Sequence, residues 1–81
     1  MNVQQAILTA MEDILGLEQQ EMLENLDLDL FENGLVDSLG IVSLITEVEG
    51  HIHHKIAIKQ IAPDSFRTVN LLAAAIEKQL G

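Results

Sequence analysis

Residues 35–49, "LVDSLGIVSLITEVE", hold the pattern that decides how the chain folds. From Ser38 onward, apolar residues recur three or four positions apart, which indicates an amphipathic helix. Its apolar stripe comprises Leu39, Val42, Leu44, Ile45, Val48 and Ile52. The run closes near "EGHIHHK", where Gly50 is the expected breaker. We therefore expect a helix that begins at or beside Ser38 and packs its stripe against the core.

Two further amphipathic helices flank this segment. Residues 3–15 carry apolar residues at helical spacing, and Gly16 stands where such a helix would stop. Near the other end, Thr68 can cap a last helix. Its expected apolar face comprises Val69, Leu71, Leu72, Ala75, Ile76 and Leu80. For residues 56–66, which contain the only proline, we predict a short third helix or a turn.

Residues 17–37 show neither helical nor alternating spacing throughout, so we predict a long, partly buried loop. A loop of this length inside a compact domain needs apolar anchors. The candidates are Leu26, Leu30, Phe31 and Leu35. With 81 residues, 48% of them hydrophobic, the chain suits one domain over residues 1–81. The expected fold class is all-α: a small bundle of three main helices plus one short helix, with a long acidic loop between the first and second.

The net charge of −9 is carried by the first half of the chain. Residues 1–37 hold nine acids and neither Lys nor Arg, whereas residues 38–81 hold four acids and four bases. Such a field repels nucleic acid and anionic lipid and favours protein partners with basic docking patches. No apolar run reaches membrane-spanning length and no basic leader begins the chain, so we expect a cytoplasmic protein without membrane insertion. We also expect a monomer.

Ser38 admits two interpretations. Either Asp37 or Ser38 could cap the helix, although neither is followed three residues later by the Glu or Gln of a capping box. The unpaired N–H groups and positive dipole end of a helix start would equally favour a phosphate esterified to Ser38. Asp37 would then help to hold a metal-bound phosphoryl donor.

Other constellations predict no chemistry of their own. The chain has no cysteine, which excludes disulfides, Cys-ligated zinc and a protein thiol. His51 and His54 have a spacing that can bind zinc or nickel, but solvated residues closing a helix explain them more simply. An EF-hand fails because Glu32 and Ser38 occupy its Gly and Glu positions. We expect no metal site and no catalytic residue.

Taken together, "DLDLFENGLV", the Asp-Ser-Leu of "LVDSLGIVSLITEVE" and "FRTVNLLAAAIE" resemble the acyl carrier protein family over nearly the whole chain. The resemblance implies that Ser38 is modified by 4′-phosphopantetheine, which a phosphopantetheinyl transferase takes from coenzyme A with magnesium, and that Asp37 assists. Cargo would be held as a thioester on this imported thiol. The domain would be a freestanding carrier and not an enzyme. Loading ligases and accepting transferases with basic patches would supply the acyl chemistry.

The motif departs from typical fatty-acid carriers, which have acids where this chain has Gly40 and Ser43. The glycine after Asp-Ser-Leu, "DLFENGLVDS" and Asn70 look more like D-alanyl carrier proteins, which load D-alanine for teichoic acids of the cell envelope. We expect Gly40, Ile41, Ser43 and Glu47 to border the surface that partners contact. The competing class is an acidic helical interaction module in which Ser38 stays unmodified and only caps.

Overall fold

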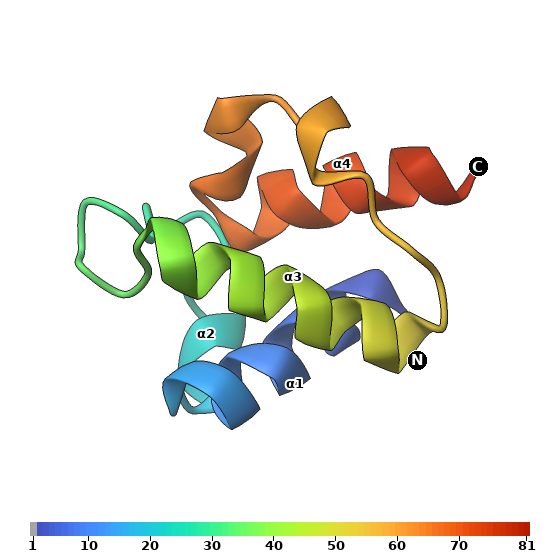
Figure 1. Ribbon diagram of the computed structural model, residues 1–81. Helices are drawn as coiled ribbons and strands as arrows, with labels where there is room; N and C mark the ends of the chain where they lie inside the picture. Colours follow the sequence, from blue (N-terminus) through green and yellow to red (C-terminus); the bar gives the residue numbers. More distant parts are fainter. Residues whose placement is uncertain (1) are drawn as a thin grey trace.

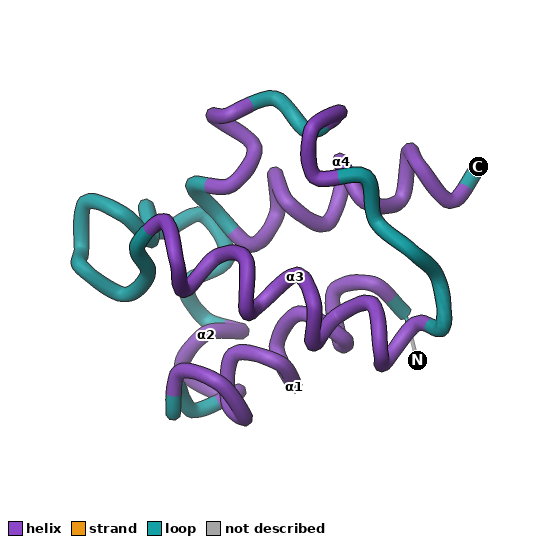
Figure 2. Tube along the Cα trace, in the orientation of Figure 1, coloured by secondary structure: helices purple, strands orange, loops and turns teal. Residues whose placement is uncertain are grey.

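The computed structural model describes residues 2–81, which form helices and turns with no strand in that range (Figures 1 and 2). The first residue of the expected 1–81 domain lies outside the described residues. The elements are α1 (Val3–Leu15), α2 (Gln19–Leu23), α3 (Ser38–Ile52), two 3-10 turns η1 (Ile58–Gln60) and η2 (Pro63–Phe66), and α4 (Val69–Leu80). The prediction of an all-α bundle with three main helices is confirmed.

Local sequence sets the helix ends. Asn2 caps α1 by accepting a hydrogen bond from the Gln5 N–H at 2.7 Å, and Gly16 ends it in the left-handed conformation at φ 70°. The predicted cap of α4 is confirmed, because Thr68 Oγ1 accepts from the Leu71 N–H at 3.0 Å. These caps satisfy N–H groups that a helix start leaves unpaired.

The core lies between α1, α3 and α4. α1 packs against both of the other long helices, and Figure 1 shows α3 across the middle of the molecule between α1 and α4. Within residues 2–81 every buried side chain is apolar. The largest fully buried side chains are Ile7, Met11, Leu30, Leu44, Ile45, Leu72, Ile76, Val48 and Val69. Burial of apolar surface in this cluster drives the fold.

The segment between α1 and α3 differs in part from its prediction as a loop. Residues 19–23 form the short helix α2, which the sequence pattern did not indicate and which buries Met22 against the core. The rest is irregular and anchored as expected: Leu30 is fully buried, while Leu26, Phe31 and Leu35 are partly buried against the same cluster. The anchoring explains how a long connection keeps one conformation.

The predicted end of α3 near "EGHIHHK" is confirmed, but Gly50 does not break the helix. α3 continues through Gly50 to Ile52, and His53 ends it in the left-handed conformation at φ 55°. Gly50 therefore stays inside the helix. Tertiary packing of α3 outweighs the cost of a helical Gly, which is about 1 kcal/mol relative to Ala. Residues 56–66, for which the sequence predicts a short helix or a turn, contain two 3-10 turns.

The predicted apolar stripe of α3 is only partly buried. Ile41, Leu44, Ile45 and Val48 face the core, whereas Leu39 is 81% exposed and Val42 is 48% exposed. The prediction that Leu39 and Val42 belong to the core was wrong. Leu71 and Leu80 of α4, which the sequence also predicts to face the core, are exposed.

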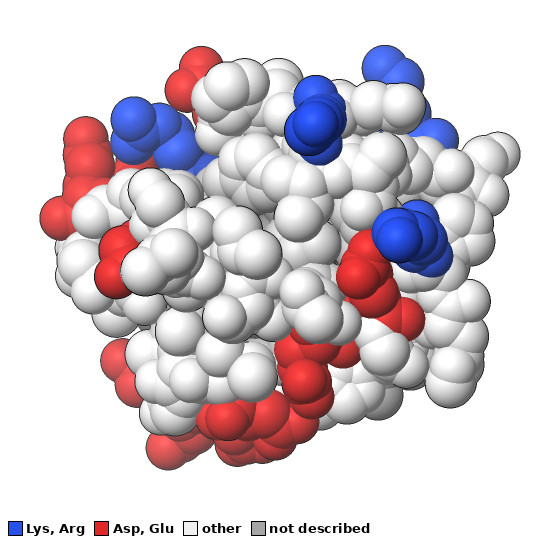
Figure 3. All heavy atoms as spheres, viewed as in Figure 1, with Lys and Arg blue, Asp and Glu red and all other residues white. Residues whose placement is uncertain are grey.

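Acidic side chains dominate the lower and left parts of the face shown in Figure 3, and a band of them runs up to the right, where it meets a basic side chain. The other basic side chains in this view lie along the upper and right margins, and one further acidic side chain lies at the top. This follows the uneven charge of the sequence, because the acids of residues 12–37 lie on and after α1. Among residues 2–81, no helix combines the length and hydropathy needed to cross a bilayer.

Candidate functional site

The start of α3 presents Ser38 with its hydroxyl free. Asp37 takes the cap: its Oδ1 accepts a hydrogen bond from the Gly40 N–H at 2.6 Å, and its carbonyl accepts from the Ile41 N–H at 2.9 Å. Ser38 is the first helical residue and is exposed, and within residues 2–81 its hydroxyl makes no hydrogen bond. The interpretation of Ser38 as the cap is therefore wrong, and its oxygen is accessible to a reagent from solvent.

Because Gly40 has no side chain, the Asp37 carboxylate can approach the first turn of α3 and accept the hydrogen bond from the Gly40 N–H. A Cβ built on Gly40 would lie 3.1 Å from Asp37 Oδ1, closer than side chains normally approach. A larger residue here would require the Asp37 carboxylate to shift by a few tenths of an ångström. The glycine two residues after Ser38 thus has a structural reason in this chain.

Contacts across the fold fix the loop that leads into Ser38. The Leu30 N–H donates to the Arg67 carbonyl at 2.7 Å, and Arg67 Nη1 lies 2.8 Å from Asp29 Oδ2. The Asn70 side-chain amide donates to Asp27 Oδ1 at 2.9 Å, and its N–H donates to the Leu26 carbonyl at 3.1 Å. Asn70, singled out from the sequence, therefore ties the start of α4 to the loop before Ser38.

Asp29 is the electrostatic centre of this anchor. The pKa of Asp29 is lowered from its ordinary 3.8, chiefly by the hydrogen bond from the Glu32 N–H, and also by the Arg67 hydrogen bond and charge, while desolvation opposes the shift. The same contact raises the pKa of Arg67. Both groups are charged at neutral pH, so they hold the loop through a charge-assisted hydrogen bond.

The expected partner surface needs one correction. Gly40, Ser43 and Glu47 are at least partly exposed on α3, but Ile41 is only 7% exposed and packs in the core. Ile41 therefore offers a partner very little surface in this structure. Leu39 and Val42, which the sequence analysis assigned to the core, are the apolar side chains that α3 offers next to Ser38. The helical period contains the signal, because Leu39 lies nearly opposite the buried arc at about 100° per residue.

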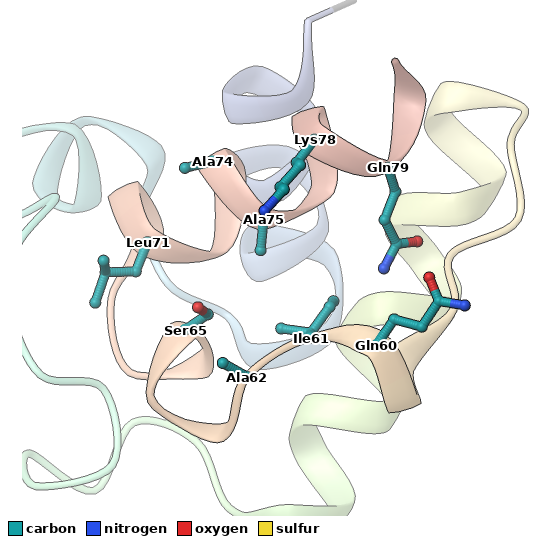
Figure 4. Close-up of a pocket in the computed structure, with 9 residues that line it drawn as sticks. All are labelled: Gln60, Ile61, Ala62, Ser65, Leu71, Ala74, Ala75, Lys78 and Gln79. Atoms are coloured by element: carbon teal, nitrogen blue, oxygen red, sulfur yellow. The ribbon is translucent and has the colours of Figure 1, made fainter.

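A groove of about 500 Å³ lies elsewhere, between the two 3-10 turns and α4 (Figure 4). It is lined by Gln60, Ile61, Ala62, Ser65, Leu71, Ala74, Ala75, Lys78 and Gln79. Neither Ser38 nor any other residue of α3 lines it. We therefore assign the groove no part in the chemistry at Ser38.

The histidines do not form the pair whose spacing the sequence suggested as a metal site. His54 Nδ1 lies 2.8 Å from the Lys55 carbonyl oxygen, so its ring binds the local backbone. His51 faces a different set of groups, Asp13 of α1 and Glu47 of α3. The sequence carries no signal for this cluster, because only the packing of α1 on α3 brings Asp13 to His51.

Comparisons with known proteins identify the family of this chain. Residues 5–81 match the family described as "Phosphopantetheine attachment site". The chain is 34% identical over 77 residues to the D-alanyl carrier protein of Enterococcus faecalis (strain ATCC 700802 / V583), covering 95% of this chain and 96% of that protein. It is 36% identical over 62 residues to the D-alanyl carrier protein of Streptococcus pyogenes serotype M1, covering 76% of this chain and 78% of that protein. The chain belongs to the phosphopantetheine-attachment family, whose members are not enzymes but shuttle cargo on a 4′-phosphopantetheine group between partner enzymes.

Proposed function

We propose that this protein is a D-alanyl carrier whose 4′-phosphopantetheine arm is attached to Ser38. The observation that carries the attachment site is the exposed Ser38 hydroxyl at the start of a 15-residue helix whose cap is supplied by Asp37. The names of the relatives support the cargo, because each of the two described is a D-alanyl carrier protein of similar length.

The start of α3 suits a phosphodiester on Ser38. The N–H groups of Ser38 and Leu39 precede the first hydrogen bonds of the helix, and the positive end of the helix dipole points at the same place. Both features favour an anion at Ser38. The residues present therefore fit the group, which supplies, when bound, the thiol that this cysteine-free chain lacks.

In the installation step we propose, Ser38 Oγ attacks the phosphorus of coenzyme A that bears the pantetheine. A bond forms from Oγ to that phosphorus, the pyrophosphate bond breaks, and adenosine 3′,5′-bisphosphate leaves while a base of the transferase takes the hydroxyl proton. Asp37 uses Oδ1 for the cap. Its other oxygen, Oδ2, is then the group that helps to hold the Mg²⁺ bound to the donor.

Partners would bind α3 through apolar contacts near Ser38, and the acidic side chains of residues 12–37 would attract them at longer range. Leu39 and Val42 stand exposed beside the attachment site, where they offer the apolar centre that protein interfaces use. The acids of residues 12–37 would steer enzymes with basic patches toward this face. A phosphopantetheinyl transferase, a loading ligase and an accepting transferase would share this surface in turn. The cytoplasmic location and the monomeric state stay predictions.

Loading tests the proposed cargo. The phosphopantetheine-bearing chain is incubated with a D-alanine-activating ligase and ATP, in parallel with acyl ligases for fatty acids, and intact mass is followed. We expect a D-alanyl thioester that hydroxylamine removes. Efficient loading with fatty acyl groups and none with D-alanine would contradict the cargo while leaving the carrier function intact.

Matched variants test the docking surface. Leu39→Ala should raise KM for the ligase severalfold, because Leu39 is 81% exposed and its loss removes contact area and not core packing. Leu23→Ala on α2, at 47% exposure, is the control and should leave KM unchanged. Equal effects of the two variants would place the contact elsewhere.

A further inference from the structure

Three metal-ligating side chains meet where α1 crosses the far part of α3. Glu47 and His51 are four residues apart on α3, which puts them on one face of the helix. Asp13, in the last turn of α1, completes the set. One ligand atom from each of the three residues lies within 4.8 Å of the other two.

The distances from His51 Nε2 to the two carboxylate oxygens are closer to those between two ligands of one metal ion than to those of hydrogen bonds. His51 Nε2 lies 3.5 Å from Glu47 Oε2 and 3.8 Å from Asp13 Oδ2. Charge-assisted hydrogen bonds between such groups are shorter, about 2.7–2.9 Å. Two ligands of a tetrahedral Zn²⁺, each about 2.1 Å from the metal, lie about 3.4 Å apart. The third separation, between the Asp13 and Glu47 carboxylate oxygens, lies within 4.8 Å.

The imidazole nitrogen that faces the carboxylates has no other partner. Within residues 2–81, His51 Nε2 is the only buried side-chain nitrogen or oxygen without a hydrogen bond. A buried polar atom without a partner is unfavourable, so its presence needs an explanation. The two carboxylates are partly exposed, at 51% for Asp13 and 37% for Glu47, which leaves an entry path and an open fourth position for water.

We propose that Asp13, Glu47 and His51 form a binding site for a divalent first-row transition ion, with Zn²⁺ as the best match to one nitrogen and two oxygen ligands. Magnesium and calcium prefer six or more oxygen ligands and would not use the imidazole. The ion would link α1 to α3 about 20 Å along α3 from Ser38, since His51 lies 13 residues further on. The site is therefore independent of the proposed carrier function.

The test is Zn²⁺ titration of the tag-free, metal-free chain by calorimetry, with three variants. We expect one Zn²⁺ per parent chain, and a loss of affinity of at least tenfold in both His51→Gln and Asp13→Asn. His54→Gln, which alters a neighbouring histidine outside the cluster, is the matched control and should stay within twofold. Excess Mg²⁺ should not displace Zn²⁺ from the parent. Co²⁺ in place of Zn²⁺ should give the intense visible absorption of a tetrahedral site.

Several outcomes would overturn the proposal. They are absence of binding by the folded parent at millimolar Zn²⁺, equal losses in His54→Gln and His51→Gln, and unchanged affinity in Asp13→Asn. Circular dichroism without metal checks that each variant is folded, and Glu47→Gln replaces any that is not. Ser38→Ala should bind Zn²⁺ like the parent, so failure of the metal site and failure of the carrier function are separate results.

Discussion

Replacing Leu30 with alanine should weaken the whole fold, although Leu30 lies in the irregular segment between α2 and α3. The side chain is fully buried in the core cluster, and its N–H is bonded to the Arg67 carbonyl. Loss of a buried leucine side chain costs about 2–5 kcal/mol through lost burial and the cavity left behind. A domain of this length has a total stability of roughly 4–12 kcal/mol. Leu30→Ala should therefore stay folded at low temperature but lose much of its free energy of unfolding.

Leu39→Ala is the matched comparison, because the same atoms are removed from a leucine that is 81% exposed. Its free energy of unfolding should stay within about 0.5 kcal/mol of the parent. The assay is thermal and urea unfolding followed by circular dichroism. Leu30→Ala should lower the midpoint temperature by about 8 °C or more, given about 4–8 °C per kcal/mol at this size. If the two variants lose equal stability, the loop is not part of the core and the account of how Ser38 is positioned fails.

Two other pairs of measurements separate stability from function. Asp37→Asn should keep the cap and the unfolding midpoint but slow phosphopantetheinylation at least tenfold. Asp37→Ala should also lose about 1 kcal/mol of stability, because it removes the capping oxygen. Phosphopantetheinylation of Asp37→Asn at the parent's rate would rule out a role for the charge of Asp37. The lowered pKa of Asp29 means that its contribution is complete above the ordinary value of 3.8 and is lost as pH falls through the folded value. Urea unfolding at pH 7 and pH 3 should therefore show a smaller acid-induced loss in Asp29→Asn than in the parent, and equal losses would show that Asp29 is not the group concerned.

Much of the fold could be predicted because local sequence decides it. The helical period of residues 3–15, the stop at Gly16 and the cap at Thr68 are all read from neighbouring residues, and the structure confirms them. The chain follows these local rules at both ends. The anchoring role of Leu30 could also be inferred, since a long connection in a small domain needs buried apolar contacts.

What could not be predicted depends on contacts between distant segments. α2 has only five residues, too few to show a period, and is held by the burial of Met22. The approach of Asp13 to His51 requires the packing of α1 on α3. Leu39 is a different case, because its position on the helix already separated it from the buried face. Its hydrophobic character alone suggests a core residue, although exposed apolar residues also mark interaction sites.

The most direct test of the account is intact mass after incubation with a broad-specificity phosphopantetheinyl transferase, Mg²⁺ and coenzyme A, with Ser38→Ala alongside. Ser38→Ala should fold like the parent, because the cap belongs to Asp37. We expect the mass of one phosphopantetheinyl group to be added to the parent and none to be added to Ser38→Ala. Modification of both chains, or of neither by several transferases on folded samples, would contradict the assignment of Ser38 as the attachment site.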